Sequence, residues 1–186
     1  MRSIIIFSGL PQTGKTTLSR RLALELGCKF VSFGDFVRRE AVRQGIVNPT
    51  RQDLQDLGQQ LVKTNPERFC QEVLRSVNFT PGEELVMDGL RHKQVLDVLS
   101  QITHNQPIKL IYLTASAEVR RIRCPQDIDL ASIDSHEVES RSETEIRPLA
   151  DLVINTQTNQ INTIESISDW VRSDCAFNNK SKEHVS

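Results

Sequence analysis

The chain has 186 residues, of which 38% are hydrophobic and 25% charged, and its formal net charge is −1. This length suits one α/β domain and leaves little room for a second. The near-neutral charge gives no indication of a nucleic-acid partner. We expect neither a signal peptide nor a membrane span, because every apolar run is short.

Four cysteines lie far apart along the chain and form no Cys-x-x-Cys pair, namely Cys28, Cys70, Cys124 and Cys175. This spacing favours reduced thiols over metal ligation. Reduced thiols are typical of the cytoplasm, so we expect a cytoplasmic protein.

The most informative motif is Gly9-Leu10-Pro11-Gln12-Thr13-Gly14-Lys15-Thr16, which matches the phosphate-binding pattern G-x-x-x-x-G-K-[ST]. The apolar run 3–8 before it predicts a short buried strand, and residues 16–26 after it predict an amphipathic helix that ends at Gly27. An ordinary glycine-containing turn does not explain a Gly-Lys-Thr triplet at the start of a helix. The pattern therefore indicates a P-loop that binds a nucleoside triphosphate.

Each position of this loop has a chemical reason. Gly9 allows a sharp turn, and Gly14 allows the backbone to approach a phosphate whose oxygens accept from loop and helix N–H groups. Lys15 brings a positive charge to the β- and γ-phosphates, the Thr16 hydroxyl is placed to hold Mg²⁺, and the Thr17 hydroxyl lies near the α-phosphate. The rest of the phosphate cradle consists of Pro11, Gln12 and Thr13.

Apolar runs that predict strands alternate with helical patterns along the rest of the chain. Further strands are expected at 28–32, 84–88, 108–113 and 152–154. Helices are expected at 35–44, from Thr50, from Pro66, at 93–102, at 117–123 and at 161–171. This alternation predicts an α/β protein with a five-stranded parallel sheet between two helical layers, the three-layer α/β/α fold of P-loop NTPases.

The segment 34–80 contains more helix than a minimal crossover between two parallel strands needs. It is either a subdomain that binds the phosphoryl acceptor or a plain helical insertion. Within it, Thr50 is a candidate N-cap, and Gly58 either weakens its helix or admits close packing.

Residues 126–145 are polar and include seven acidic residues. This segment is either a mobile lid over the nucleotide or a solvated helical hairpin, and we assign the lid region to 124–147. The helix at 161–171 is expected to bury Ile164, Ile167 and Trp170. Residues 1–175 then form a single domain, and 176–186 form a flexible tail.

A second acidic position follows the predicted strand 84–88. Ligands of open α/β sheets lie outside the carboxyl ends of the strands, so Asp88 is placed to hold Mg²⁺, although it could instead cap the next turn. Arg91 stands at the same edge, and Arg38 follows Gly34 and Asp35 on a helix. A guanidinium fork suits a second phosphate group. Asp35 either N-caps its helix or contacts the substrate.

Arg120, Arg121 and Arg123 precede the lid region. Three charges this close together do not all point inward. We expect one or two of them to neutralise the transferring phosphoryl group or to stack on a base, and the remainder to be solvated.

Three segments in this order, 9–16, 33–38 and 86–91, resemble adenylate kinases and other nucleoside monophosphate kinases. The closer resemblance is to small archaeal and bacterial AAA-type P-loop ATPase or kinase proteins related to dephospho-CoA kinase. Their short motifs are similar to residues 34–40, 88–91, 115–123 and 150–155. The resemblance runs from about residue 4 to about residue 170.

The resemblance implies roles for several residues. Arg38 and Arg91 would hold the phosphate of the acceptor nucleotide, and Asp88 would be the Walker-B carboxylate. At the base of the lid, Arg123 and Arg120 would face ATP. Two further matches are Arg141, a lid-side arginine, and Asn155, at the adenine-binding loop.

Two departures from the family pattern bear on activity. Phe33 stands where adenylate kinases usually carry a threonine that touches the acceptor base. The segment 124–140 contains no arginine or lysine, where related kinases tend to place lid arginines.

The sequence thus predicts an ATP-dependent phosphotransferase that uses Mg²⁺, acts on a nucleoside monophosphate and exists as a monomer or small homo-oligomer. Its partners would be small-molecule nucleotides. Phosphoryl transfer needs alignment and charge compensation, which Lys15, Asp88, Arg123 and Arg141 would supply. The alternative is an ATP-binding regulatory or adaptor protein with little or no turnover. A kinase for a plain alcohol is disfavoured, because such an acceptor needs no paired arginines.

Overall fold

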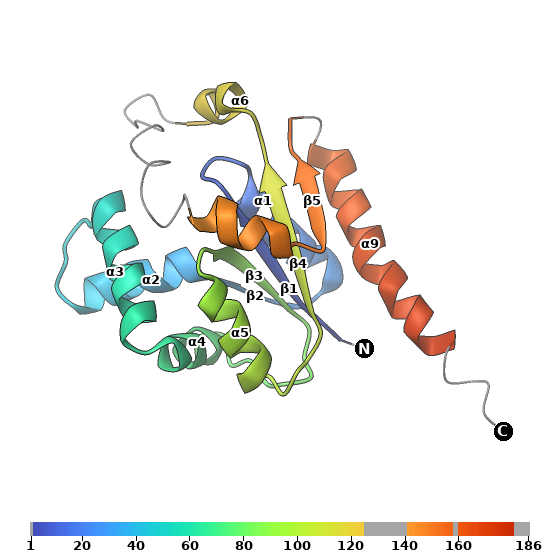
Figure 1. Cartoon of the computed structure of the whole chain (residues 1–186), viewed down its shortest axis with the longest axis horizontal. Helices are drawn as coiled ribbons and strands as arrows, with labels where there is room; N and C mark the ends of the chain where they lie inside the picture. The colour runs from blue at the N-terminus through green and yellow to red at the C-terminus, as the bar shows by residue number, and fades with distance from the viewer. Residues whose placement is uncertain (1, 125–140, 158–159, 181–186) are drawn as a thin grey trace.

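The computed structural model describes residues 2–124, 141–157 and 160–180. Its centre is one sheet of five parallel strands in the order β2-β3-β1-β4-β5 (Figure 1). The strands are β1 (Ile4–Gly9), β2 (Lys29–Ser32), β3 (Leu85–Leu90), β4 (Ile108–Thr114) and β5 (Leu152–Asn155). The predicted parallel sheet is confirmed, and each strand begins and ends within two residues of its expected bounds.

Helices cover both faces of the sheet (Figure 1). One layer contains α1 (Lys15–Leu26) and α9 (Gln160–Lys180); the other contains α2 (Phe33–Arg43), α3 (Arg51–Thr64), α4 (Pro66–Arg75) and α5 (Lys93–Ile102). Alternate residues of β1 enter the two cores, because successive side chains of a strand point to opposite faces. Ile4 and Ile6 pack under α2–α5, and Ile5 and Phe7 pack under α1 and α9. Burial on both faces explains why β1 reads as an unbroken apolar run.

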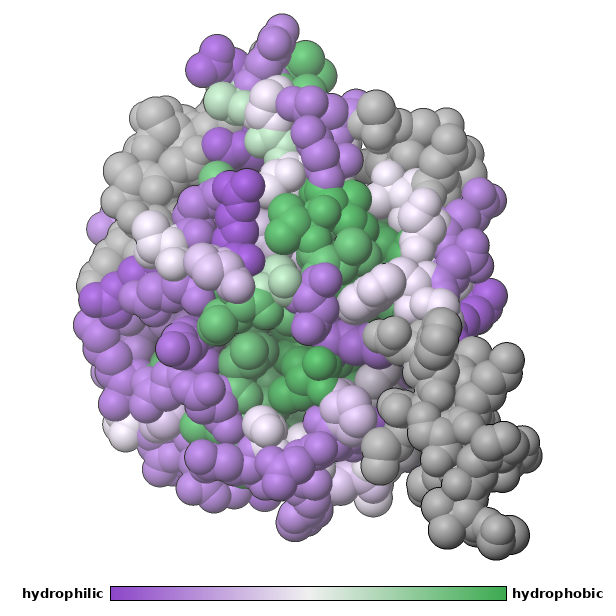
Figure 2. Space-filling model, turned by 45° about the vertical axis from the view of Figure 1, so that its right-hand side comes forward, coloured by the Kyte–Doolittle hydropathy of each residue, from purple (hydrophilic) through white to green (hydrophobic). Residues whose placement is uncertain are grey.

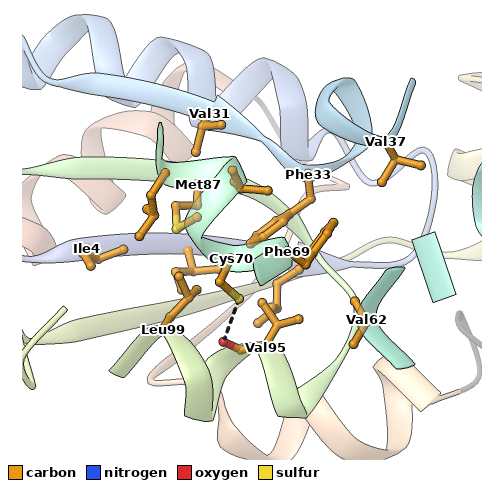
Figure 3. Packing of buried hydrophobic residues seen from close by; sticks show 14 of the residues in the cluster. Ile4, Val31, Phe33, Val37, Val62, Phe69, Cys70, Met87, Val95 and Leu99 are labelled. Carbon is orange, nitrogen blue, oxygen red and sulfur yellow. Dashed lines mark hydrogen bonds between the residues drawn. The ribbon is translucent and has the colours of Figure 1, made fainter. Parts of the chain in front are cut away.

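The larger core lies between the sheet and the insertion helices, as Figure 3 shows. Phe33 and Phe69 stack with ring centroids 5.8 Å apart, which joins the start of α2 to α4. Cys70 is fully buried beside them, and its thiol lies 4.0 Å from the carbonyl oxygen of Val95. Burial raises the pKa of the Cys70 thiol to about 12, so this cysteine behaves as a small apolar side chain.

The insertion helices have well-defined N-termini. Thr50 and Asp53 form a capping box on α3, and the predicted capping role of Thr50 is confirmed. On α2 the cap is Ser32, whose Oγ accepts a hydrogen bond from the Asp35 backbone N–H at 3.2 Å. The alternative that Asp35 caps this helix is therefore wrong. A Cβ at Gly58 would lie 3.6 Å from Val37, an ordinary contact distance, so α2 and α3 are close at this position without requiring a glycine there.

The described segments between β4 and β5 contain one expected helix and two helical turns that the sequence did not predict. The short helix α6 (Ala117–Ile122) is present, and the predicted lid region 124–147 lies outside the described residues from 125 to 140. Its end forms the helical turn η1 (Ser142–Ile146), whose Ser142 and Ile146 are buried, and it continues into η2 (Arg147–Leu149). This end is therefore part of the packed domain.

The closing helix α9 runs to Lys180, well beyond the expected end at residue 171 and into the segment 176–186 that the sequence assigns to a tail. Ile164 and Ile167 are buried as expected. Trp170 is only partly buried, and the Lys109 ammonium lies 5.0 Å from the centre of its ring.

The exterior is mainly polar. Figure 2 shows one face on which apolar side chains gather in two separate patches. Among the described residues, the most exposed large hydrophobic side chains lie far apart along the chain, namely Leu24, Val47 and Ile122. Within the part of the chain that the structure covers, no helix is both long enough and apolar enough to cross a bilayer.

The backbone of the P-loop start is fixed by its contact with β4. Gly9 has a φ of +133°, and a Cβ there would lie 2.2 Å from the carbonyl oxygen of Leu113. We expect Gly9→Ala to lower the free energy of unfolding by about 3 kcal/mol or more, because strain and overlap add. Gly82→Ala is the matched control, with a φ of +95° and no atom within 4 Å, and should cost only about 1 kcal/mol. Urea denaturation measures the free energy of unfolding of both variants. Equal losses would contradict a steric clash between the new Cβ at residue 9 and the Leu113 carbonyl oxygen.

Candidate active site

The P-loop connects the central strand β1 to α1 at the carboxyl edge of the sheet. Gln12 and Gly14 have positive φ angles of 62° and 89°, which curl the loop. The Thr13 hydroxyl donates to the Leu10 carbonyl oxygen at 2.8 Å, and the Lys15 ammonium donates to the same oxygen at 2.6 Å. In the described structure no side chain caps α1, so its N-terminal N–H groups suit an anion.

Thr16 and Asp88 meet at the ends of adjacent elements. β1 pairs with β3 so that Phe7 lies opposite Asp88, which brings the carboxylate to the start of α1. The Thr16 hydroxyl donates to Asp88 Oδ2 at 2.7 Å. Asp88 is 3% exposed, and its Oδ1 is buried without a hydrogen bond within the described structure. Burial raises the pKa of Asp88, while the Thr16 hydroxyl and the Lys15 and Arg91 charges act in the opposite direction.

Lys15 is buried among other cations. Burial is the main cause that lowers the pKa of Lys15 to about 7, and the charges of Arg91, Arg51 and Arg120 contribute in the same direction. Asp88 is the carboxylate that opposes them. The pocket therefore carries more positive charge than its own acidic group balances, which suits a polyanionic ligand.

This cationic pocket predicts proton uptake when a nucleotide binds. The phosphates stabilise protonated Lys15, so its pKa should rise from about 7 towards its ordinary value. At pH 8 the free protein holds Lys15 mostly neutral, and binding of Mg·ATP should take up about one proton. Affinity should fall as the pH rises above 7. Calorimetric titration in buffers of different ionisation enthalpy measures this uptake, and Lys15→Met should abolish it.

A cavity of about 340 Å³ opens at the carboxyl end of β3, between α2, α3 and the start of α5. The predicted acceptor residues Arg38 and Arg91 line it, together with Arg51. No carboxylate is among its described lining residues. Burial is the main cause that lowers the pKa of Arg91 to about 10, and the Arg51 charge adds to it. Arg51 was not predicted as a site residue from the sequence. The one feature that could have indicated it is its position directly after the predicted N-cap Thr50.

Asp35 pairs with Arg38, which lines this cavity, and with Arg20 of α1. Its Oδ1 lies 3.1 Å from Arg38 Nη1, and its Oδ2 lies 2.9 Å from Arg20 Nη2. The Arg38 side chain is 59% exposed, so it can reorient towards a ligand at little cost. Of these two arginines only Arg38 is among the described residues that line the cavity.

Two arginines at α6 connect to the P-loop, Arg120 directly and Arg123, which follows the helix, through Thr156. Arg120 is 5% exposed, and its Nη1 donates to the Pro11 carbonyl oxygen at 3.4 Å. Arg123 donates to the hydroxyl and the carbonyl oxygen of Thr156, at 3.1 and 2.6 Å. Thr156 in turn donates to the Thr13 carbonyl oxygen at 2.9 Å. Thr156 is a second residue that sequence reasoning missed, and it connects the loop after β5 to the P-loop.

The other two residues matched by resemblance lie at the surface. Arg141 is about half exposed and lies 3.9 Å from Glu145. Asn155 ends β5, and its amide donates to the Gln157 side chain at 3.3 Å. The structure thus brings together the P-loop, Asp88, Arg91 and Arg120 at one edge of the sheet. The part of the lid from 125 to 140 lies outside the described residues.

A P-loop at the end of the central strand, with an acidic residue at the end of the neighbouring strand, defines a P-loop kinase-like, nucleotide-binding fold. The chain belongs to the protein family described as "AAA domain", whose family model matches residues 8–147. This range includes the P-loop from Ser8, both predicted acceptor arginines and Arg123. The resemblance to P-loop kinases drawn from the sequence is confirmed.

Individual relatives agree with this assignment. A UPF0200 protein of Aeropyrum pernix is 34% identical over 100 residues, 54% of this chain and 52% of that protein. A cytidylate kinase of Ignicoccus hospitalis is 41% identical over 44 residues, 24% of this chain and 26% of that enzyme. The matched part of the chain therefore spans less than two thirds of these relatives' length.

The fold itself has counterparts among solved structures. Shikimate kinase from Acinetobacter baumannii, in complex with shikimate, superposes with a TM-score of 0.62 at 18% identity and covers 94% of this chain and 95% of that chain. At this identity the likeness establishes the three-layer kinase fold and does not extend to the substrate.

Proposed function

We propose that the protein is an ATP-dependent nucleoside monophosphate kinase, which converts ATP and a nucleoside monophosphate into ADP and a nucleoside diphosphate. The observation that carries this proposal is the junction of two half-sites at the end of β3. Asp88 faces the P-loop, and Arg91, three residues later, lines the cavity. A donor and a phosphate-bearing acceptor would therefore meet across one strand end. The matched segment of a cytidylate kinase supports the same reaction class.

The residues at this junction fit Mg²⁺. The buried Oδ1 of Asp88 and the hydroxyl of Thr16 are hard oxygen ligands of the kind that this ion prefers. We propose that Thr16 and Asp88 hold it, directly or through water. When bound, Mg²⁺ neutralises phosphate charge that would otherwise repel an anionic acceptor.

The protein's own groups would align the reactants and offset charge. Lys15 would neutralise the donor phosphates, Arg91 and Arg38 would fix the acceptor phosphate, and Arg120 would support the P-loop at Pro11. An ionised phosphate is already nucleophilic, so no general base is required. Arg123 would order the nucleotide-binding loop through Thr156. The described cysteines are free thiols, which fits the cytoplasmic location that we propose.

One observation favours a second candidate function, an ATP-binding adaptor with little turnover. The segment 124–140 has no arginine or lysine, and Arg123, the nearest arginine before it, bonds to Thr156. An adaptor would bind Mg·ATP tightly, transfer nothing and co-purify with a partner protein.

A screen with γ-labelled ATP and Mg²⁺ tests the proposed reaction. The acceptors are CMP, UMP, AMP, GMP, their deoxy forms and dephospho-CoA. We expect a labelled nucleoside diphosphate from at least one nucleoside monophosphate. The absence of transfer to every acceptor, with Mg·ATP bound, would refute the kinase and favour the adaptor.

Arg38→Ala should separate the two half-sites. Because Arg38 lines the acceptor cavity, we expect the KM of the acceptor to rise about tenfold and the KM of ATP to stay nearly constant. Arg39→Ala, the exposed neighbour that donates to Ser76 at 3.5 Å, is the control and should change neither value. An equal loss for both substrates would contradict this division of roles.

A further inference from the structure

The inner face of α3 lines much of the acceptor cavity. Arg51, Gln55, Gly58 and Val62 are spaced by four, three and four residues, so they lie on one face of the helix, and all four line the cavity. The cavity-facing positions differ in chemistry along the helix, from a cation at its N-terminal end to apolar groups further on.

The cationic end of the cavity contains three guanidinium groups, from Arg38, Arg51 and Arg91. The Arg51 charge acts on both Arg91 and Lys15, so it lies close enough to the two half-sites for these charges to interact. Like charges in a buried site repel, and a phosphate monoester with two negative charges relieves that repulsion. Arg51 thus joins the arginines that favour an anionic acceptor.

The other end is apolar. Phe33, Val37, Val62 and Phe69 converge there, and Figure 3 shows them around the stacked phenyl rings. Gln55 is the one uncharged side chain with an amide or hydroxyl group among the described lining residues. A polyhydroxylated acceptor would bury several hydroxyl groups against these walls without partners, which is costly. A flat heterocycle needs apolar walls and hydrogen bonds at one edge.

We propose that α3 reads both ends of the acceptor, with Arg51 binding its phosphate beside Arg91 and Gln55 hydrogen-bonding the edge of its base. The inference rests on the proposed function and narrows it, because the preferred acceptor is then a nucleotide with a flat base and not a sugar phosphate or a polyol.

Equilibrium binding without ATP tests Arg51 independently of transfer. The probes are the four ribonucleoside monophosphates, ribose 5-phosphate and shikimate, titrated calorimetrically into the wild-type protein and into Arg51→Gln. We expect the tightest nucleotide and ribose 5-phosphate each to lose about tenfold or more in affinity. Arg39→Gln is the matched control. Arg51→Lys, which retains the charge but not the fork, should lose less and serves if Arg51→Gln fails to fold.

Gln55→Leu tests the other end. This substitution should lower the affinity for the tightest-binding nucleotide about fivefold and leave the affinity for ribose 5-phosphate unchanged. The proposal is overturned if both Arg51 variants bind nucleotides as the Arg39 control does, or if ribose 5-phosphate or shikimate binds as tightly as any nucleotide. Arg51-dependent nucleotide binding without phosphoryl transfer would support this inference while refuting the kinase. Phosphoryl transfer by the wild-type protein, together with unaltered nucleotide binding by the Arg51 variants, would support the kinase and refute this inference.

Discussion

Lys15→Met is expected to reduce phosphoryl transfer by about 10³-fold, because it removes the cation nearest the transferring phosphate from a site shielded from water. The substitution retains the apolar length of the side chain and leaves the Leu10 carbonyl oxygen with the Thr13 hydroxyl as a hydrogen-bond donor. The loss should therefore come from charge and not from a collapsed loop. Single-turnover measurements with saturating Mg·ATP separate the rate of transfer from binding.

The same variant should be at least as stable as the wild type. Burial and three guanidinium charges oppose protonation of Lys15, so an uncharged side chain of similar length removes an unfavourable charge from the folded state. Urea denaturation at pH 6, where Lys15 is mostly protonated, should show the largest gain. Lys93→Met, at an exposed position at the start of α5, is the control for both experiments. A destabilised Lys15→Met protein with normal transfer would contradict both expectations.

The sheet and the donor half of the site could be predicted from the sequence because their signals are local. A parallel strand buried on both faces is a continuous apolar run, as in 4–7 and 110–113, and the P-loop is one uninterrupted motif. Asp88 could be placed because the carboxyl ends of parallel strands share one edge of the sheet. That geometry follows from the fold class alone.

The missing parts depend on how separate elements pack. Arg51 and Arg91 are forty residues apart, and only the orientation of α3 over the sheet brings their charges together. Thr156 is a single threonine after an edge strand, with no periodic pattern to mark it, yet it links Arg123 to the P-loop. Ile146 ends a polar segment and is buried in the core. It is the only apolar residue of η1, so no apolar pattern in the sequence predicts its burial.

The role of Arg123 shows the limit of arguing from resemblance. The family pattern implies an arginine that faces ATP, whereas this guanidinium donates to both oxygens of Thr156. A resemblance in sequence transfers the position of a residue along the chain. It does not transfer the hydrogen bonds of the side chain, which depend here on a loop more than thirty residues away.

Asp88→Asn should change the affinity for ATP in opposite directions with and without Mg²⁺. The carboxylate lies beside Lys15 and the Thr16 hydroxyl. On our proposal, its loss removes a metal ligand and also a negative charge that repels phosphates. We expect Mg·ATP to bind more weakly and transfer to fall by about 10³-fold or more. Metal-free ATP, measured in EDTA, should bind as tightly as to the wild type or more tightly.

This reversal distinguishes a metal-binding role of Asp88 from a structural one. If Asp88 only capped the turn at Gly89, the substituted asparagine would retain most of that function, and ATP would bind alike with and without Mg²⁺. If Asp88 held the pocket open, both forms of ATP would bind more weakly. Asp97→Asn, an exposed carboxylate of α5, controls for the change in net charge and should alter neither affinity. Only a metal ligand predicts that EDTA removes the defect of Asp88→Asn.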